Sequence, residues 1–385
     1  MEKDRKKKIA VITGSRADFG LITPVLFAIK KSKKLDLQLY ITGLHLMPRF
    51  GKTANEVKRL FPKAVEIRAI FKNDERSAAA DFSGILINKL VGVFRKNRPD
   101  FVLILGDRPE ILSAALACLY LGIPIGHIHG GEKTTTVDES ARHAITKLSQ
   151  LHFPATKEAS ERIVKMGEES WRIKIVGAPA LDTILHEPLP SRKKLFKNLG
   201  LNPDKPVILL IQHPVSEDYK NSGKQIAETI AAVKSFNLPV IAIYPNSDAG
   251  GGKMISEINK QRGNPNFHIF SSLPYKDFLA LEREAAAWVG NSSAAIIESA
   301  SFKTPVVNIG NRQSGRPQNK NIINVDYNRE QIKSAVKKSL TDKIYLNNLK
   351  KIKNNWGDGK TGPRVAKILE NLKINAKLLN KRINY

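Results

Sequence analysis

Carboxylates that follow apolar runs in the first half of the chain are the side chains best suited to proton transfer. Asp107 comes just after the run 101–105, and Glu132 and Asp138 come after the run 125–129. A positioned carboxylate takes a proton from carbon, or gives one back, when its surroundings adjust its pKa. Capping of the following helix is an alternative role for Asp107 and Asp138, because carboxylates favour helix starts. The pattern predicts acid–base chemistry at these three residues.

Polar residues at a predicted helix start in the second half could bind a diphosphate. Residues 290–293 (Gly, Asn, Ser, Ser) precede a helix that is expected to carry Glu298. Free N–H groups and the hydroxyls of Ser292 and Ser293 form an anion site, and Glu298 could accept hydrogen bonds from ribose hydroxyls. Arg312 adds a cation on a glycine-bearing loop. Simple helix capping by the two serines is the alternative.

Four more polar residues lie where strands are expected to end. Arg16 follows the first apolar run and is a candidate phosphate contact, with a surface arginine at a turn as the alternative. Its surroundings match neither G-x-G-x-x-G nor a P-loop, so a dinucleotide or γ-phosphate site is not indicated. His213, Asn246 and Asp248 follow two strands of the second half. Because ligands bind at strand ends in doubly wound sheets, we expect these residues to face a ligand.

Two histidines, His127 and His129, alternate along one predicted strand. Side chains at such spacing are expected on the same face of a strand. A metal site would need a third ligand, and no spacing in the sequence supplies one. Hydrogen-bonding or catalytic roles fit the histidines better, so we predict no bound metal.

Short apolar runs rich in β-branched residues alternate with longer helix-like segments, and together they must position these side chains. Such runs are typical of parallel strands that are buried on both faces and joined by crossover helices. Segments such as 21–31 and 110–121 supply the helices. The predicted fold class is therefore α/β with doubly wound parallel sheets. We expect strands at 9–13, 37–42, 101–105, 125–129, 173–176, 207–211, 240–244, 267–270 and 306–309.

The length and the strand pattern indicate two domains. The 385 residues exceed the size at which one hydrophobic core usually keeps growing. The strand pattern restarts after the proline-bearing stretch 185–192, and residues 362–379 alternate apolar and basic side chains at helical spacing. We predict an N-terminal domain over 1–185, a C-terminal domain over 186–362, and a terminal helix and tail over 363–385 that pack back on a domain surface.

The formal net charge of +27 asks for an explanation. Lysines are scattered along the chain instead of clustering with aromatic residues, which argues against a nucleic-acid binder. We therefore ascribe most of them to a solvated surface. The single cysteine, Cys118, lies in an apolar stretch and is expected to be a buried thiol. The first apolar run is too short for a signal peptide and the tract 111–125 too short to span a membrane, so we expect a cytoplasmic protein without nucleic-acid or membrane partners.

Taken together, the polar clusters resemble the hydrolysing UDP-N-acetylglucosamine 2-epimerases of bacterial sialic-acid pathways and the epimerase half of the animal bifunctional enzyme. The resemblance implies two Rossmann-like domains that face each other across a cleft, a GT-B-like arrangement, with UDP held mainly by the C-terminal domain. It also implies a UDP-sugar substrate, a homodimer or homotetramer, and no cofactor. It spans nearly the whole chain, at 14–18, 106–108, 127–132, 138–139, 142–147, 212–214, 246–250, 290–293, 310–316 and 357–359.

By position in these motifs, the resemblance implies two sets of site residues. Two positions depart from the pattern: Leu21 stands where many relatives carry a lysine, and His129 stands where some carry a glutamate. The set near the sugar comprises Asp107, Glu132, Asp138 and His213. The set that holds UDP and the substrate comprises Arg16, Arg108, His129, Asn246, Asp248, Ser292, Ser293, Glu298 and Arg312.

The activity implied by the resemblance is an elimination followed by a hydration. Cations, a histidine and a helix N-terminus stabilise the departing UDP, and a carboxylate takes the C2 proton to leave a glycal. Water then adds at C1 while a second acid protonates C2 from the opposite face, which yields N-acetylmannosamine. Asp107 and either Glu132 or Asp138 are the expected pair, with His213 assisting the departure of UDP.

Four other functions fit parts of the sequence. A non-hydrolysing epimerase would return UDP to C1. A hydrolysing 2-epimerase of UDP-2,4-diacetamido-2,4,6-trideoxyglucose would share almost every motif. A glycosyltransferase of the same shape would need an acceptor site and no second proton-transfer acid. A binder of anionic polymers, driven by the net charge of +27, would bind nucleic acid with a steep salt dependence.

Overall fold

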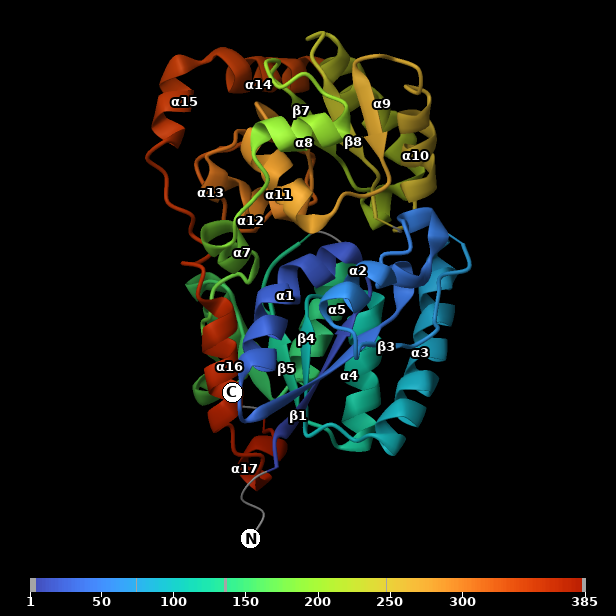
Figure 1. Cartoon of the computed structure of the whole chain (residues 1–385), viewed down its shortest axis with the longest axis vertical. Coiled ribbons are helices and arrows are strands. Elements are labelled where there is room, and N and C mark those ends of the chain that lie inside the picture. The colour runs from blue at the N-terminus through green and yellow to red at the C-terminus, as the bar shows by residue number, and fades with distance from the viewer. Residues whose placement is uncertain (1–4, 74, 135–136, 247, 383–385) are drawn as a thin grey trace.

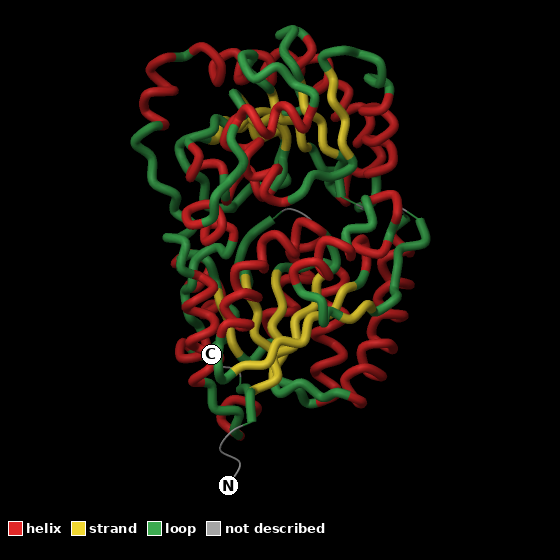
Figure 2. The backbone as a smooth tube through the Cα atoms, viewed as in Figure 1, coloured by secondary structure: helices red, strands yellow, loops and turns green. Residues whose placement is uncertain are grey.

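Two six-stranded sheets form the centre of the molecule, and Figure 2 shows them as two separate groups of strands. The computed structural model describes residues 5–73, 75–134, 137–246 and 248–382. All strand pairs are parallel. The first sheet contains β1 (Lys7–Thr13), β2 (Leu35–Ile41), β3 (Val65–Glu66), β4 (Phe101–Leu105), β5 (Ile125–Ile128) and β6 (Leu151–Phe153). The second contains β7 (Ile208–Ile211), β8 (Val240–Ile243), β9 (Phe267–Phe270), β10 (Ala287–Gly290), β11 (Val306–Ile309) and β12 (Ile322–Val325).

The strand orders of the two sheets are equivalent. The first is β3-β2-β1-β4-β5-β6, and the second is β12-β11-β10-β7-β8-β9. Each order reverses once, between β1 and β4 and between β7 and β10. In such sheets ligands bind outside the carboxyl ends of the strands at the point of reversal. The prediction of an α/β fold with two Rossmann-like sheets is confirmed.

The first lobe, built on β1 to β6, has helices on both faces of its sheet. Figure 1 shows it in the lower half of the molecule. One face packs against α1 (Arg16–Lys31) and α16 (Thr361–Asn371), and the other against α3 (Arg76–Lys96), α4 (Pro109–Leu121) and α5 (Val137–Leu148). The remaining helices of this part of the chain are α2 (Ala54–Leu60), α6 (Lys157–Lys165), α7 (Ala180–His186) and α17 (Ala376–Leu379).

The second lobe, built on β7 to β12, is also covered on both faces. Apolar residues of α9 (Ser222–Lys234), α10 (Gly251–Asn259) and α14 (Arg329–Thr341) form a core on one face, and those of α8 (Arg192–Leu199) and α11 (Tyr275–Glu284) on the other. The remaining helices are α12 (Ser293–Ile297), α13 (Ser299–Phe302) and α15 (Lys343–Leu349).

After the second lobe the chain returns to the first. The segment 362–379, expected to be one helix, forms α16 and α17 instead. The side chain of Asn375 accepts a hydrogen bond from the backbone N–H of Leu378 and so begins a new helix. Leu369 of α16 and Leu378 of α17 are buried in the core of the first lobe. Figure 1 shows both helices beside that lobe. The domain boundaries at residues 185 and 362 stay a prediction.

One predicted strand is wrong. Residues 173–176 form only an isolated bridge, between Ile173 and His152. The edge position beside β5 belongs to β6. This strand has three residues and includes His152, so it is too short and too polar to be recognised as an apolar run in the sequence. The strands β3, β10 and β12 were also not predicted.

Helix α3 is long and apolar enough, by length and composition alone, to cross a membrane. The mean hydropathy of Ser77–Lys96 is 1.3, and this segment is a second apolar tract besides 111–125. Phe82, Leu86 and Leu90 of α3 lie at every fourth position and are buried in the core of the first lobe. That spacing is typical of a helix with one face in a protein core.

Candidate active site

A cleft of about 330 Å³ lies between the two lobes, and it contains nearly all the residues that the sequence singled out. Asp107 of the first lobe and Ser292 of the second line the same cavity. Asp248 does not line it but pairs with Arg108, which does. Twelve of the thirteen predicted site residues line the cleft: Arg16, Asp107, Arg108, His129, Glu132, Asp138, His213, Asn246, Ser292, Ser293, Glu298 and Arg312. Their individual roles stay predictions.

Polar contacts join the two lobes across the cleft. Arg108 Nη1 lies 2.8 Å from Asp248 Oδ1. Arg16 donates to Ser272 Oγ at 2.5 Å, and its Nε is 2.8 Å from Glu56 Oε2 in the first lobe. The two arginines follow β4 and β1, the two strands at the point of reversal of the first sheet. The cleft is therefore bridged by the residues that were predicted to bind phosphate.

Asp107, just after β4, is held by a buried arginine. Arg142 of α5 is 1% exposed and donates to Asp107 Oδ2 and, at 2.7 Å, to the carbonyl oxygen of Glu132. Burial opposes ionisation of Asp107, but the positive charges of Arg142 and then Arg316 outweigh it and lower the pKa of this carboxyl. Asp107 is therefore an ionised carboxylate at neutral pH, able to accept a proton.

Asp138, in the first turn of α5, has the opposite electrostatic setting. Burial, together with the negative charges of Asp107 and Asp248, raises the pKa of Asp138 to about 7, although Arg108 opposes the shift. Two carboxyl groups whose environments push their pKa values apart are a usual arrangement for a base and an acid. At neutral pH Asp138 can therefore act as a proton donor beside the ionised Asp107.

Glu132 is engaged on both of its carboxyl oxygens. His129 Nδ1 lies 2.5 Å from Oε1, and Arg316 Nη2 lies 3.0 Å from Oε2. Burial opposes ionisation, but the charges of His129 and Arg316 lower the pKa of Glu132 to about 2. With a 2% exposed side chain and two ion-pair partners, Glu132 is less available for proton transfer than Asp138.

Contrary to the prediction from the sequence, His127 and His129 do not lie on the same face of one strand. Strand β5 ends at Ile128, and His129 has a positive φ of 63°. Burial lowers the pKa of His127 to about 3, and its Nε2 lies 2.7 Å from the carbonyl oxygen of Gly106. His127 thus supports the loop that carries Asp107. Among the described residues, no group of three or more His, Cys, Asp or Glu side chains could hold a metal ion.

His213 follows β7 and is fixed from two sides. Asn291 accepts from the backbone N–H of His213 at 2.6 Å and donates to its carbonyl oxygen at 2.9 Å. Burial and the charge of Arg312 lower the pKa of His213 to about 3, so the ring is neutral. The backbone N–H of Asn246 donates to His213 Nδ1 at 3.1 Å. Because Nδ1 accepts, the ring proton is on Nε2, where it can be donated to a ligand.

Ser292 is the residue before α12, yet its side chain makes no capping hydrogen bond. The side chain of Ser292 therefore does not cap α12. Glu298 follows the short α12 rather than lying within one long helix. Behind it, Glu282 of α11 is completely buried. Burial raises the pKa of Glu298 to about 7 and also raises the pKa of Glu282.

Sequence reasoning missed the residues that support the site. Arg142 was noted only as a motif member, although its place four residues after Asp138 puts both on one face of α5. That spacing was a usable signal. Asn291 and Glu282 carried no comparable signal, because their partners are distant in the sequence.

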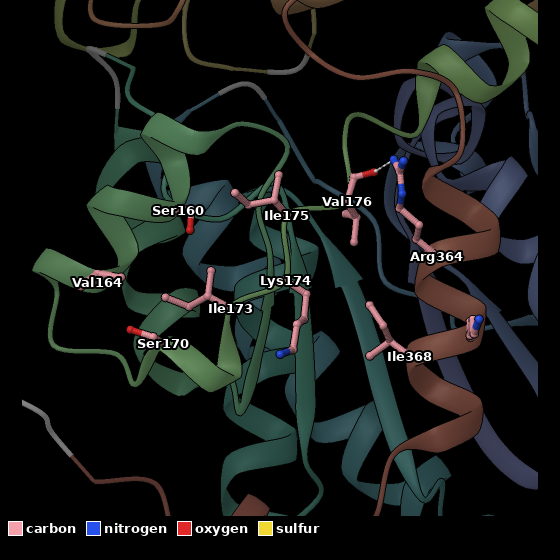
Figure 3. Close-up of a pocket in the computed structure, with 10 residues that line it drawn as sticks. Ser160, Val164, Ser170, Ile173, Lys174, Ile175, Val176, Arg364 and Ile368 are labelled. Atoms are coloured by element: carbon pink, nitrogen blue, oxygen red, sulfur yellow. Dashed lines mark hydrogen bonds between the residues drawn. The ribbon is translucent and has the colours of Figure 1, made fainter.

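A second hollow, of about 610 Å³, lies on the first lobe. Figure 3 shows Ser160 and Val164 of α6 on one side, Arg364 and Ile368 of α16 on the other, and residues 173–176 between them. None of the thirteen predicted site residues lines it. The carboxylates, cations and hydroxyls gather in the cleft between the lobes.

Comparison with known proteins identifies the family. The profile described as UDP-N-acetylglucosamine 2-epimerase matches residues 27–370. A hydrolysing UDP-N,N'-diacetylbacillosamine 2-epimerase of Legionella pneumophila is 38% identical over 378 residues, 97% of this chain and 98% of that protein. The chain belongs to the UDP-N-acetylglucosamine 2-epimerase family. A family member from Neisseria meningitidis, a UDP-N-acetylglucosamine 2-epimerase, is 35% identical over 336 residues, 86% of this chain and 87% of that protein.

Solved structures of the family share the fold. A UDP-GlcNAc 2-epimerase from Neisseria meningitidis, bound to UDP-GlcNAc, superposes with a TM-score of 0.80 at 19% identity and covers 94% of this chain and 99% of that one. A Methanocaldococcus jannaschii enzyme in complex with UDP-GlcNAc and UDP gives 0.77 at 22% identity, with 94% and 99% covered. The two facing lobes are the GT-B-like fold of this family.

Proposed function

We propose that the chain is a hydrolysing 2-epimerase that converts UDP-N-acetylglucosamine and water into UDP and N-acetylmannosamine, without a cofactor. The observation that carries the proposal is the pair of carboxyls with opposite protonation, Asp107 and Asp138, in one cleft with the anion-binding groups of the second lobe. A non-hydrolysing epimerase would use the same pair of carboxyls, and the relatives described as hydrolysing favour hydrolysis. A glycosyltransferase and a binder of anionic polymers have no comparable support.

The leaving group has to be stabilised first, because the C2 hydrogen becomes acidic only as positive charge grows on C1. Arg312, the hydroxyls of Ser292 and Ser293, and the N–H of His213 Nε2 face the cleft where a diphosphate would lie. Donors fixed in advance stabilise developing negative charge without reorganising. The electron pair of the C1–O bond then leaves with UDP.

Proton transfer belongs to the first lobe. Asp107 takes the C2 proton as the C1–C2 double bond forms, which gives UDP and a glycal. The oxygen of a water molecule then bonds to C1 while Asp138 gives its proton to C2 from the opposite face. The proton that the water loses restores protonated Asp138, and Asp107 releases its proton to solvent. We favour Asp138 over Glu132 for this second step because both oxygens of Glu132 are held in ion pairs.

A second substrate has specific support. Leu21, Leu44 and Phe50 line the cleft, and their apolar side chains suit a methyl group at C6 better than a hydroxyl. The Legionella relative and a Campylobacter jejuni protein, 35% identical over 328 residues, are described as hydrolysing 2-epimerases of diacetylbacillosamine nucleotides. UDP-2,4-diacetamido-2,4,6-trideoxyglucose is therefore the alternative substrate.

Turnover of both UDP-sugars in water enriched in deuterium and oxygen-18 tests the proposal. We expect release of UDP, deuterium at C2 and oxygen-18 at C1 of the free manno-configured sugar. The sugar with the higher kcat/KM is the substrate. Recovery of an intact UDP-manno-sugar would indicate the non-hydrolysing reaction, and absence of turnover on either sugar would contradict the proposal.

We further propose a homodimer or homotetramer and a cytoplasmic location, in line with the family resemblance. Light scattering on the purified chain measures the first, and fractionation of the source cells measures the second.

A further inference from the structure

A buried carboxyl that no catalytic step uses lies beneath the cleft. Glu110 is the second residue of α4 and is 1% exposed. Neither of its carboxyl oxygens has a hydrogen-bond partner among the residues that the structure describes. It does not line the cleft. An unpaired buried polar group lowers the stability of the fold, so the presence of Glu110 at this position requires an explanation.

The carboxyl fills space that two glycines leave free. A Cβ atom on Gly14, just after β1, would lie 2.4 Å from Glu110 Oε1, and one on Gly43, just beyond β2, would lie 2.5 Å from the same oxygen. The Cβ on Gly43 would also lie 3.0 Å from the carbonyl oxygen of Gly14. The carboxyl oxygen of Glu110 and this carbonyl oxygen therefore border the same small space.

The segments that meet at Glu110 also carry the contacts across the cleft. The Gly14 loop leads into Arg16, which donates to Ser272 of the second lobe at 2.5 Å. Helix α4 starts immediately after Arg108, which is 2.8 Å from Asp248 of the second lobe. Glu110 and Gly14 are thus each two residues along the chain from a residue that makes a cross-cleft contact.

Charge at Glu110 would disturb this arrangement. A neutral carboxyl can pack against the two glycine loops, whereas a carboxylate would bury an unpaired charge there and repel the Gly14 carbonyl oxygen. The charged groups that act on it are Arg108 beside its own helix, Asp18 on α1, and Asp248 from the second lobe. Burial raises the pKa of Glu110 to about 7, with Arg108 opposing and Asp18 adding to the shift.

We infer that Glu110 is a positioning residue: its protonated carboxyl holds the Gly14 and Gly43 loops against α4 and so keeps the lobes closed on UDP, and ionisation of Glu110 loosens that closure. This inference rests on the proposed function for the identity of the ligand. Glu110 itself does not contact the substrate. Arg108 and Arg16 are the groups through which it acts.

Calorimetric titration of UDP into the whole chain from pH 6 to pH 8.5 tests the inference. Wild-type affinity is expected to weaken about tenfold more across this range than the affinity of Glu110→Gln, because the amide keeps the shape of the carboxyl and stays neutral at every pH. Ionisation of Asp138 and of UDP itself affects both proteins equally and cancels in the comparison. Glu110→Leu, which is also neutral at every pH, is expected to share the weak pH dependence of Glu110→Gln.

The matched control is Glu158→Gln, which neutralises an exposed carboxylate on α6 of the same lobe. It is expected to follow the wild type at every pH. Equal pH dependence of UDP affinity in the wild type and Glu110→Gln would overturn the inference, and so would a Glu158→Gln protein that lost the dependence as completely as Glu110→Gln.

Small-angle scattering without ligand separates this inference from the proposed function. The radius of gyration of the wild type is expected to increase between pH 6 and pH 8.5, and that of Glu110→Gln to stay constant. If the wild type binds no UDP at any pH, the proposed function is wrong. The radius of gyration still tests whether ionisation of Glu110 separates the two lobes. A radius that is equally constant in both proteins would overturn the role of Glu110.

Discussion

The two walls of the cleft differ in how their polar groups are arranged. On the wall from the first lobe, Asp107 and Glu132 are each tied to a buried arginine, and Asp138 is held in its neutral form. On the wall from the second lobe, Ser292 has a hydroxyl that its helix does not use, and His213 is a neutral donor. One wall has carboxyls with fixed protonation states, and the other has hydrogen-bond donors, among them the cation Arg312.

This difference separates proton transfer from the binding and departure of UDP. Changes to the carboxyls of the first wall are expected to reduce turnover with little effect on UDP affinity, because they alter which group holds the proton. Changes to the donors of the second wall are expected to weaken UDP binding and also to slow the departure of UDP. Each prediction below tests that division, from the largest expected effect to the smallest.

Asp107→Asn is expected to lower kcat by about a thousandfold, because the amide cannot take the C2 proton. UDP affinity is expected to stay within about threefold of the wild-type value, since the amide oxygen still accepts from Arg142. Steady-state kinetics and calorimetry measure the two quantities. Asp204→Asn, an exposed substitution in the second lobe, is the control and is expected to change neither. A large loss of UDP affinity in Asp107→Asn would show that this wall also binds.

The pH dependence of kcat is expected to show a single alkaline limb. The pKa of Asp138 is raised to about 7, and an acid works only in its protonated form, so kcat at saturating substrate is expected to fall roughly tenfold between pH 7 and pH 8.5. The lowered pKa of Asp107 keeps the base ionised well below neutrality. Asp138→Asn is expected to have a low kcat without an alkaline limb. If the limb persists in that variant, Asp138 is not the acid.

Ser292→Ala is expected to weaken UDP binding about fivefold, the loss of roughly one hydrogen bond to an anion, and to lower kcat by about the same factor, because the same hydroxyl stabilises the departing UDP. Calorimetry on UDP gives the first value and saturation kinetics the second. Ser314→Ala, on the exposed part of the loop after Arg312, is a matched control for loss of a hydroxyl. Equal affinity in Ser292→Ala and Ser314→Ala would remove Ser292 from the UDP site.

Much of the fold, and most of the residues that line the cleft, could be predicted because both follow from local sequence patterns. Apolar runs such as β1 and β4 end at polar residues, and the carboxyl ends of parallel strands meet at one edge of a sheet. The same criterion failed for β6, where His152 interrupts a three-residue strand whose position is set by pairing with β5.

The protonation states could not be predicted, because they depend on groups that meet only in the folded chain. Asp107 and Asp138 are the same residue type in similar positions at the start of helices. Arg142 lowers the pKa of Asp107, and burial together with the charge of Asp107 raises the pKa of Asp138. The setting of Glu110 was hidden for the same reason, since it is created by Gly14 and Gly43 from the segments that follow β1 and β2.

The return of α16 and α17 to the first lobe also affects how the protein is made. Val365, Leu369 and Leu378 belong to the same core as β1 and α1, and Arg172 donates hydrogen bonds to the carbonyl oxygens of Lys377 and Leu378. During translation the first lobe therefore has an uncovered apolar face until α16 and α17 have been synthesised. The second lobe, whose residues lie between, can fold before that. A nascent chain of this kind is exposed to aggregation for most of its synthesis, and chaperones are expected to bind its earliest part longest.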